Sequence, residues 1–227
     1  KQFLSNHTVP APEVAALIAI EIGTALAHAH SLGILHRDVK PENVMVRRDG
    51  LVKLMDFGVA QIIDFERMTV TGQLLGSPAY MAPELIEGKP LDFRTDVFAM
   101  GIMLYQLATG ALPFSGRNPH EVLKRIAEGR FVDPRKVNKL ITDPLARIIT
   151  RALARLPDDR YPTVTAMLQE LHVFTTEAGL QNNKDEVRSF FTAPETFDGA
   201  LRARMVPALV ASGKRETVAG RTARALE

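Results

Sequence analysis

Three polar residues in one short loop have the side chains that phosphoryl transfer requires. The loop at residues 34–43 reads Ile-Leu-His-Arg-Asp-Val-Lys-Pro-Glu-Asn and contains Asp38, Lys40 and Asn43. A carboxylate can orient a hydroxyl nucleophile, an ammonium can neutralise charge that develops on a phosphate, and an amide oxygen can bind Mg²⁺. A lone Asp in a loop is more often a turn or cap residue, so the neighbouring motifs must decide whether Asp38 is catalytic or structural.

Two further motifs follow this loop in a fixed order. Residues 56–58 read Asp-Phe-Gly, and residues 82–84 read Ala-Pro-Glu. Each tripeptide is weak evidence alone, but in this order and spacing the three segments match H-R-D-L-x-x-x-N, D-F-G and A-P-E, with Val39 in place of Leu. From about residue 1 to residue 174 the chain resembles a eukaryotic-like (Hanks-type) serine/threonine protein kinase of bacterial type.

Residues 34–43 are called the catalytic loop from here on. The resemblance implies a role for its polar residues Asp38, Lys40 and Asn43. Asp38 would accept or orient the proton of the substrate hydroxyl, and Lys40 would lie against the transferring phosphate. Asn43 and Asp56 would bind Mg²⁺, or Mn²⁺ in its place, between the phosphates of ATP. The residues that would bind ATP and its metal are Lys40, Glu42, Asn43, Met45 and Asp56.

The resemblance also indicates which kind of hydroxyl accepts the phosphate, and that phosphorylation of the kinase itself regulates its activity. Lys40 and Ser77 are typical of the serine/threonine branch, in which Ser77 would bridge the catalytic Asp and Lys; the alternative is an ordinary turn serine. Arg37 would pair with a phosphate on the loop that follows Asp-Phe-Gly. Thr69 and Thr71 resemble threonines that bacterial members autophosphorylate, and the alternative is that they are unmodified loop residues.

Five more residues resemble structural positions of the family. Glu84 and Arg160 would form a buried ion pair, and Asp96 would hydrogen-bond the backbone of the catalytic loop. His36 and Phe57 would pack together in the regulatory column of the fold, so we expect His36 to be a buried, satisfied histidine and not a base.

Composition limits the class of protein. A net charge of +2 (28 Lys and Arg against 26 Asp and Glu) gives no strong field, so we expect no nucleic-acid partner. The absence of cysteine excludes disulfides and Cys-based zinc sites. No run comes near the roughly 18 apolar residues of a membrane helix, so we expect no membrane segment here. These features are compatible with a cytoplasmic location, with any membrane anchor outside this segment.

Periodicity and capping residues predict a mostly helical α+β fold with one small hairpin beside the catalytic loop. The expected helices are 12–32, 96–109 with Thr95 as cap, 118–129, 143–156 and 163–174, and the expected strands are 44–46 and 52–55. Residues 1–174 would form the C-terminal lobe of a kinase domain. Residues 175–227 would be a linker and a helical extension, with helical pieces at 198–211 and 215–227.

No segment corresponds to the Gly-rich loop or the Val-Ala-Ile-Lys strand that precede the catalytic loop in this family. We therefore expect the N-lobe to be absent from this sequence, and, because it begins with Lys1, we expect the natural N-terminus to lie upstream. The expected partners are ATP, proteins with Ser or Thr, and a second copy for phosphorylation in trans. The alternatives are a pseudokinase-like or truncated scaffold that binds partners near residues 111–130, and a small-molecule kinase.

Overall fold

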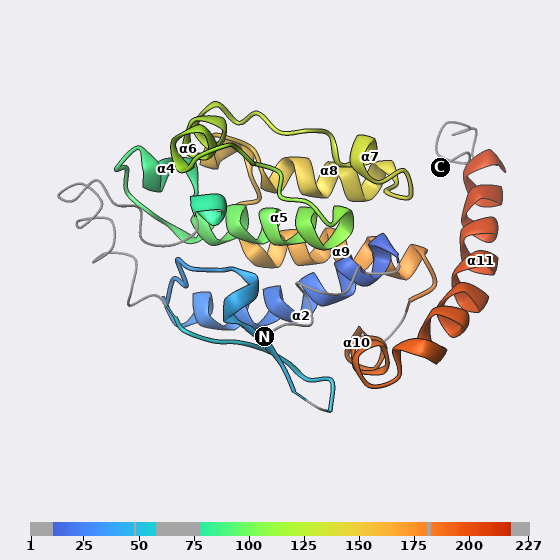
Figure 1. Cartoon of the computed structure of the whole chain (residues 1–227). Helices are drawn as coiled ribbons and strands as arrows, with labels where there is room; N and C mark the ends of the chain where they lie inside the picture. Colours follow the sequence, from blue (N-terminus) through green and yellow to red (C-terminus); the bar gives the residue numbers. More distant parts are fainter. Residues whose placement is uncertain (1–10, 48, 58–77, 181–182, 219–227) are drawn as a thin grey trace.

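The computed structural model describes residues 11–47, 49–57, 78–180 and 183–218. The predicted site residues Thr69, Thr71 and Ser77 lie outside these ranges. Figure 1 shows a layered group of helices with a two-stranded hairpin on one side and two further helices, α10 and α11, at one end of the group.

The centre of the fold is α2 (Pro12–Ser31), which packs against α5 (Phe93–Thr109) and α9 (Val164–Glu177) (Figure 1). By length and composition α2 could cross a membrane, contrary to the expectation that no run is apolar enough. Its residues 14–20 are all at most 1% exposed inside the protein, as in the core helix of a globular fold. Length and apolar composition are therefore weak evidence that this helix crosses a membrane.

Shorter elements surround this core. Proline stands at the first or second position of many of them, where its missing N–H costs nothing. The remaining elements are η1 (Pro41–Asn43), η2 (Pro78–Tyr80), α4 (Pro83–Ile86), α6 (Pro119–Glu128), α7 (Pro134–Val137), α8 (Asp143–Ala152), η3 (Pro157–Asp159), α10 (Asn183–Thr192) and α11 (Pro194–Val218).

The predicted hairpin is confirmed. Strand β1 (Val44–Val46) pairs antiparallel with β2 (Val52–Leu54), with Val44 opposite Leu54. The turn contains Gly50 at φ 79°, a conformation that glycine adopts without strain. At the other end, the Met55 N–H donates to the Asn43 carbonyl at 2.8 Å. The hairpin thus joins the end of the catalytic loop to the residue before Asp56.

Two helix boundaries differ from the expectation. The N-cap of α5 is Asp92, whose carboxylate accepts from the Arg94 N–H at 2.8 Å, and not Thr95, whose hydroxyl donates instead to Glu84. Helix α8 ends at Ala152 and not near 156, because the carbonyls of Ala154 and Arg155 accept from the buried Arg160 side chain.

The end of the chain also differs from a linker with two separate helical pieces. Helix α9 continues to Glu177, so the expected boundary at 174 falls inside it, and α11 is one helix from Pro194 to Val218 with Pro207 in its interior. Helix α10 packs against α2, and its Val187 and Phe190 are at most 4% exposed. The division of the chain into a kinase lobe at 1–174 and a linker with a helical extension at 175–227 stays a prediction.

Candidate active site

The three polar residues of the catalytic loop meet at one carboxylate. Asp38 Oδ2 lies 2.7 Å from Lys40 Nζ and accepts a hydrogen bond from Asn43 Nδ2 at 2.9 Å. Asn43 Nδ2 also donates to the Asp38 carbonyl at 2.8 Å. The side chain of Asp38 is 17% exposed, so the carboxylate reaches solvent while both neighbours fix its direction. The structure thus brings together the residues that the sequence predicted to be catalytic.

The residues predicted to hold a metal fit Mg²⁺ in type and place. The Asn43 amide nitrogen is used by Asp38, which leaves Asn43 Oδ1 as an acceptor without a hydrogen bond from the described residues. Asp56 follows β2 at the same end of the hairpin as Asn43 and is exposed. Mg²⁺ prefers a small number of protein oxygens together with phosphate oxygens and water. Among the described residues, no cluster of three acidic or histidine ligands offers a competing site.

Backbone strain marks both sides of this site. Arg37 (φ 64°) and Asp56 (φ 60°) are the non-glycine residues with positive φ in the described part of the chain. Such conformations cost about 1–3 kcal/mol each and persist only where neighbouring contacts enforce them. One of these residues precedes Asp38 and the other is a predicted metal ligand, so the strain is concentrated where side-chain direction matters.

Asp96 enforces the strained loop. Its carboxylate is fully buried and accepts the backbone N–H groups of His36 and Arg37, both at 2.8 Å. The predicted contact between Asp96 and the loop backbone is therefore present. His30, which the sequence analysis did not single out, contributes a third contact, with Nε2 at 2.7 Å from Asp96 Oδ2. Its position in the last turn of a predicted helix was the signal available.

His36 is buried and satisfied, as expected. Its Nε2 lies 3.0 Å from the Met55 carbonyl, and its ring lies 4.6 Å from that of Phe57. Burial lowers the pKa of His36 below its ordinary value, and the hydrogen bond to the Met55 carbonyl opposes this change only in part. Met45, predicted to bind ATP, and Phe57 are 38% and 37% exposed.

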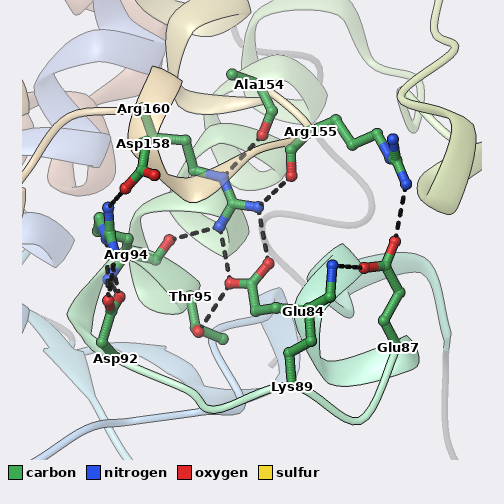
Figure 2. A network of polar contacts seen from close by, with 10 residues as sticks. All are labelled: Glu84, Glu87, Lys89, Asp92, Arg94, Thr95, Ala154, Arg155, Asp158 and Arg160. Carbon is green, nitrogen blue, oxygen red and sulfur yellow. Dashed lines mark hydrogen bonds and ion pairs between the residues drawn. The ribbon is translucent and has the colours of Figure 1, made fainter.

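A buried ion pair fastens α4 to the segment after α8. Arg160 donates to Glu84 through two bonds of 2.8 Å, and the two side chains are 0% and 4% exposed (Figure 2). Burial alone would raise the pKa of Glu84, but the hydrogen bonds and charge of Arg160 outweigh it and lower the pKa. The Thr95 hydroxyl adds a bond of 2.9 Å to Glu84.

The rest of the Arg160 guanidinium is also satisfied. It donates to the carbonyls of Ala154, Arg94 and Arg155 at 2.8–3.0 Å (Figure 2). All of its donors therefore have partners, which is the condition under which a buried charge is tolerated. The sequence predicted the pair with Glu84, but these carbonyl acceptors come from segments that only folding brings together.

A second contact links the core to the end of the activation segment, the name used here for the residues from Asp-Phe-Gly (56–58) to Ala-Pro-Glu (82–84). The Tyr80 hydroxyl in η2 donates to Gln106 Oε1 of α5 at 2.5 Å. Burial and the nearby charge of Glu42 raise the pKa of Tyr80, so the phenol stays protonated and remains a donor. The Gln106 side-chain oxygen is therefore used inside the protein.

Comparisons with known proteins show the family of the chain. The protein kinase domain family matches residues 1–173. A Clostridium perfringens protein named as a probable serine/threonine-protein kinase is 38% identical over 159 residues, which cover 70% of this chain and 23% of that protein. The tyrosine-protein kinase MasK of Myxococcus xanthus is 36% identical over 180 residues, which cover 76% of this chain and 28% of MasK.

A solved structure shows the same fold. Rad53 residues 1–466 in complex with AMP-PNP match with a TM-score of 0.61 and 31% identity, over 74% of this chain and 42% of that one. The chain therefore belongs to the protein kinase family. It spans about a quarter of the length of the curated relatives that it matches.

Proposed function

We propose that this chain carries the catalytic loop of a serine/threonine protein kinase that transfers the γ-phosphate of ATP to protein hydroxyls. The observation that carries the proposal is the convergence of Lys40 and Asn43 on one oxygen of the Asp38 carboxylate. An isolated loop aspartate would serve as a cap, whereas this one is held in one direction by two side chains and is open to solvent.

In the proposed reaction, Asp38 orients the substrate hydroxyl and accepts its proton as the new oxygen–phosphorus bond forms. The bond between the γ-phosphorus and the bridging oxygen breaks, and ADP carries away the negative charge. Lys40, already beside the carboxylate, can shift toward the phosphate as charge develops there. Asn43 Oδ1 and Asp56 would hold Mg²⁺, which supplies charge neutralisation of the phosphates, and Glu42 and Met45 would border the nucleotide.

Serine and threonine are the proposed acceptors because of Lys40 and Ser77. The relatives' names include both serine/threonine and tyrosine kinases, so the names alone leave the acceptor open. A panel of peptides that differ only in Ser, Thr or Tyr at the acceptor position decides between them. Phosphate on Tyr alone would contradict this part of the proposal.

Arg37 is the proposed receiver of a loop phosphate on Thr69 or Thr71. Its Nε is buried and has no hydrogen-bond partner among the described residues. A buried guanidinium nitrogen without a partner is costly, and a phosphate oxygen would satisfy it. Mass spectrometry of the chain after incubation with an active form tests this; unmodified Thr69 and Thr71 would contradict it.

We further propose that the 227 residues alone transfer little phosphate. In this family the catalytic residues work together with a strand lysine, a helix glutamate and a Gly-rich loop that cover ATP. No such loop occurs in the sequence of this chain.

A cytoplasmic setting, with ATP and reduced thiols, is the proposed environment.

Two measurements test the function. Radiolabelled transfer to a basic protein is measured for the 227-residue chain and for a longer chain that adds a Gly-rich loop and a strand lysine before Lys1. The proposal expects transfer by the longer chain, lost on Asp38→Asn, and little by the shorter one. Equal transfer by Asp38→Asn would contradict the assigned chemistry, and binding of partners without any transfer would favour the scaffold alternative.

A further inference from the structure

The turn of the hairpin touches the C-terminal helices. A side chain added at Gly50 would lie 2.6 Å from Arg188 Cα and 2.9 Å from its carbonyl oxygen, so α10 passes directly over the turn. Gly50 is buried, although it is a turn residue. In Figure 1 the hairpin extends from the catalytic loop toward α10.

The helices that make this contact are themselves anchored. Val187 and Phe190 of α10 are buried, and α10 packs against α2. Glu186, 6% exposed, forms a double ion pair with Arg204 of α11, one bond of which is 2.8 Å. The ring of Phe190 lies 5.5 Å from that of Phe197.

A second close approach fixes the far part of this unit. A side chain at Gly179, φ 78°, would lie 2.6 Å from Ala208 Cβ, so α11 leans on the end of α9. The helical unit at residues 183–218, here called the brace, is therefore held at both α9 and the hairpin turn. Each contact is at a glycine whose positive φ and missing Cβ let a helix come close.

The hairpin needs such support. An isolated two-stranded hairpin is marginally stable in water. One of its ends is fixed by the Asn43–Asp38 and Met55–Asn43 hydrogen bonds, and the other end is the turn at Gly50. Strand β2 also packs on α2, and at the turn the nearest atoms to a side chain added at Gly50 are those of Arg188 in the brace.

We infer that the brace positions the hairpin and, through it, the oxygen ligands Asn43 and Asp56. Residues 183–218 would then be part of the catalytic unit, and a movement of α10 would change the order of the metal-binding end. The roles of Asn43 and Asp56 rest on the proposed function. The positioning itself is a property of the fold and can be measured without phosphoryl transfer.

Hydrogen exchange of the 227-residue chain tests the inference. Gly50→Ala puts a methyl group against Arg188, and Gly110→Ala is the matched control, because Gly110 has φ 74° and nothing within 4 Å of an added Cβ. Both variants carry the same backbone strain. We expect exchange of the Met55 amide roughly tenfold faster in Gly50→Ala than in the control, about 1.4 kcal/mol of opening free energy.

A second variant perturbs the same contact from α10 and not from the hairpin turn. Phe190→Ala removes the ring that seats α10 and leaves the hairpin sequence intact, so we expect the same acceleration at Met55 with little change at Ile148 and Ile149 of α8. If Gly50→Ala accelerates Met55 and Phe190→Ala releases α10 without affecting Met55, the effect belongs to the turn alone and the inference is wrong. Equal exchange in Gly50→Ala and Gly110→Ala would also overturn it.

Discussion

Arg160 and Glu84 face each other through two parallel hydrogen bonds of 2.8 Å inside the protein, 76 residues apart in sequence. The pair ties α4, which follows the activation segment, to the segment after α8, which packs on the core (Figure 2). The end of the activation segment therefore has a fixed anchor, while its preceding residues lie outside the described ranges.

Breaking this pair from one side should be far more costly than breaking an exposed pair. In Arg160→Leu the Glu84 carboxylate loses its compensating charge, and we expect a loss of about 3–5 kcal/mol in the free energy of unfolding. The control is Arg125→Leu, which removes an exposed i,i+4 pair with Glu121, and there we expect only a small loss. Urea denaturation of the variants gives both values.

The double variant Glu84→Leu/Arg160→Leu distinguishes a stranded charge from lost packing. Because both charges are then removed, we expect it to recover a large part of the stability that Arg160→Leu loses. A double variant no more stable than Arg160→Leu would show that the guanidinium acts mainly through its three carbonyl partners and its contact with the Phe98 ring.

Asp96→Asn should loosen the catalytic loop. The carboxamide cannot accept two backbone N–H groups on two oxygens as Asp96 does for His36 and Arg37, and one buried donor is left without a partner. We expect a loss of about 1–3 kcal/mol and faster exchange of the two loop amides. Asp159→Asn, at an exposed residue of η3, is the control. Unchanged loop amides in Asp96→Asn would contradict the holding role.

Two groups predict how stability changes with pH. Because the pKa of His36 is lower in the folded state, the unfolded chain binds more protons, and stability should fall as pH drops below about 6.5. The lowered pKa of Glu84 adds a second loss as pH falls below about 4.5. Denaturation from pH 8 to pH 4 measures this, and His36→Gln should flatten the slope just below pH 6.5. An unchanged slope in that variant would assign the effect elsewhere.

The catalytic assignment predicts an ordered series of rates in a chain that transfers phosphate. Asp38→Asn should lower kcat by about 10²–10⁴, as expected for loss of a positioned base. Lys40→Ala should lower kcat, whereas Lys53→Ala, an exposed lysine of β2, should leave it unchanged. Asn43→Ala should raise the Mg²⁺ concentration required for half of the maximal rate. Equal effects of Lys40→Ala and Lys53→Ala would contradict the role of Lys40.

Much of the local structure was predictable because it depends on neighbours in sequence. Helix α2 begins at Pro12 as expected, the helices expected from residues 118 and 163 begin there with Asn118 and Thr163 as N-caps, and the two strands are within one residue of their predicted ends. The N-cap of α5 was wrong because the Thr95 hydroxyl has a distant acceptor, Glu84, with which a local cap cannot compete.

By itself, the sequence determined the identity and order of the predicted catalytic residues, because those motifs are short and their spacing is fixed by one loop and one hairpin. Only the tertiary structure decided what holds them in place. The carboxylate of Asp96 collects donors from segments 60 residues away, and α10 reaches the hairpin turn at Gly50. Such contacts depend on how helices pack in three dimensions, which periodicity and capping residues do not specify.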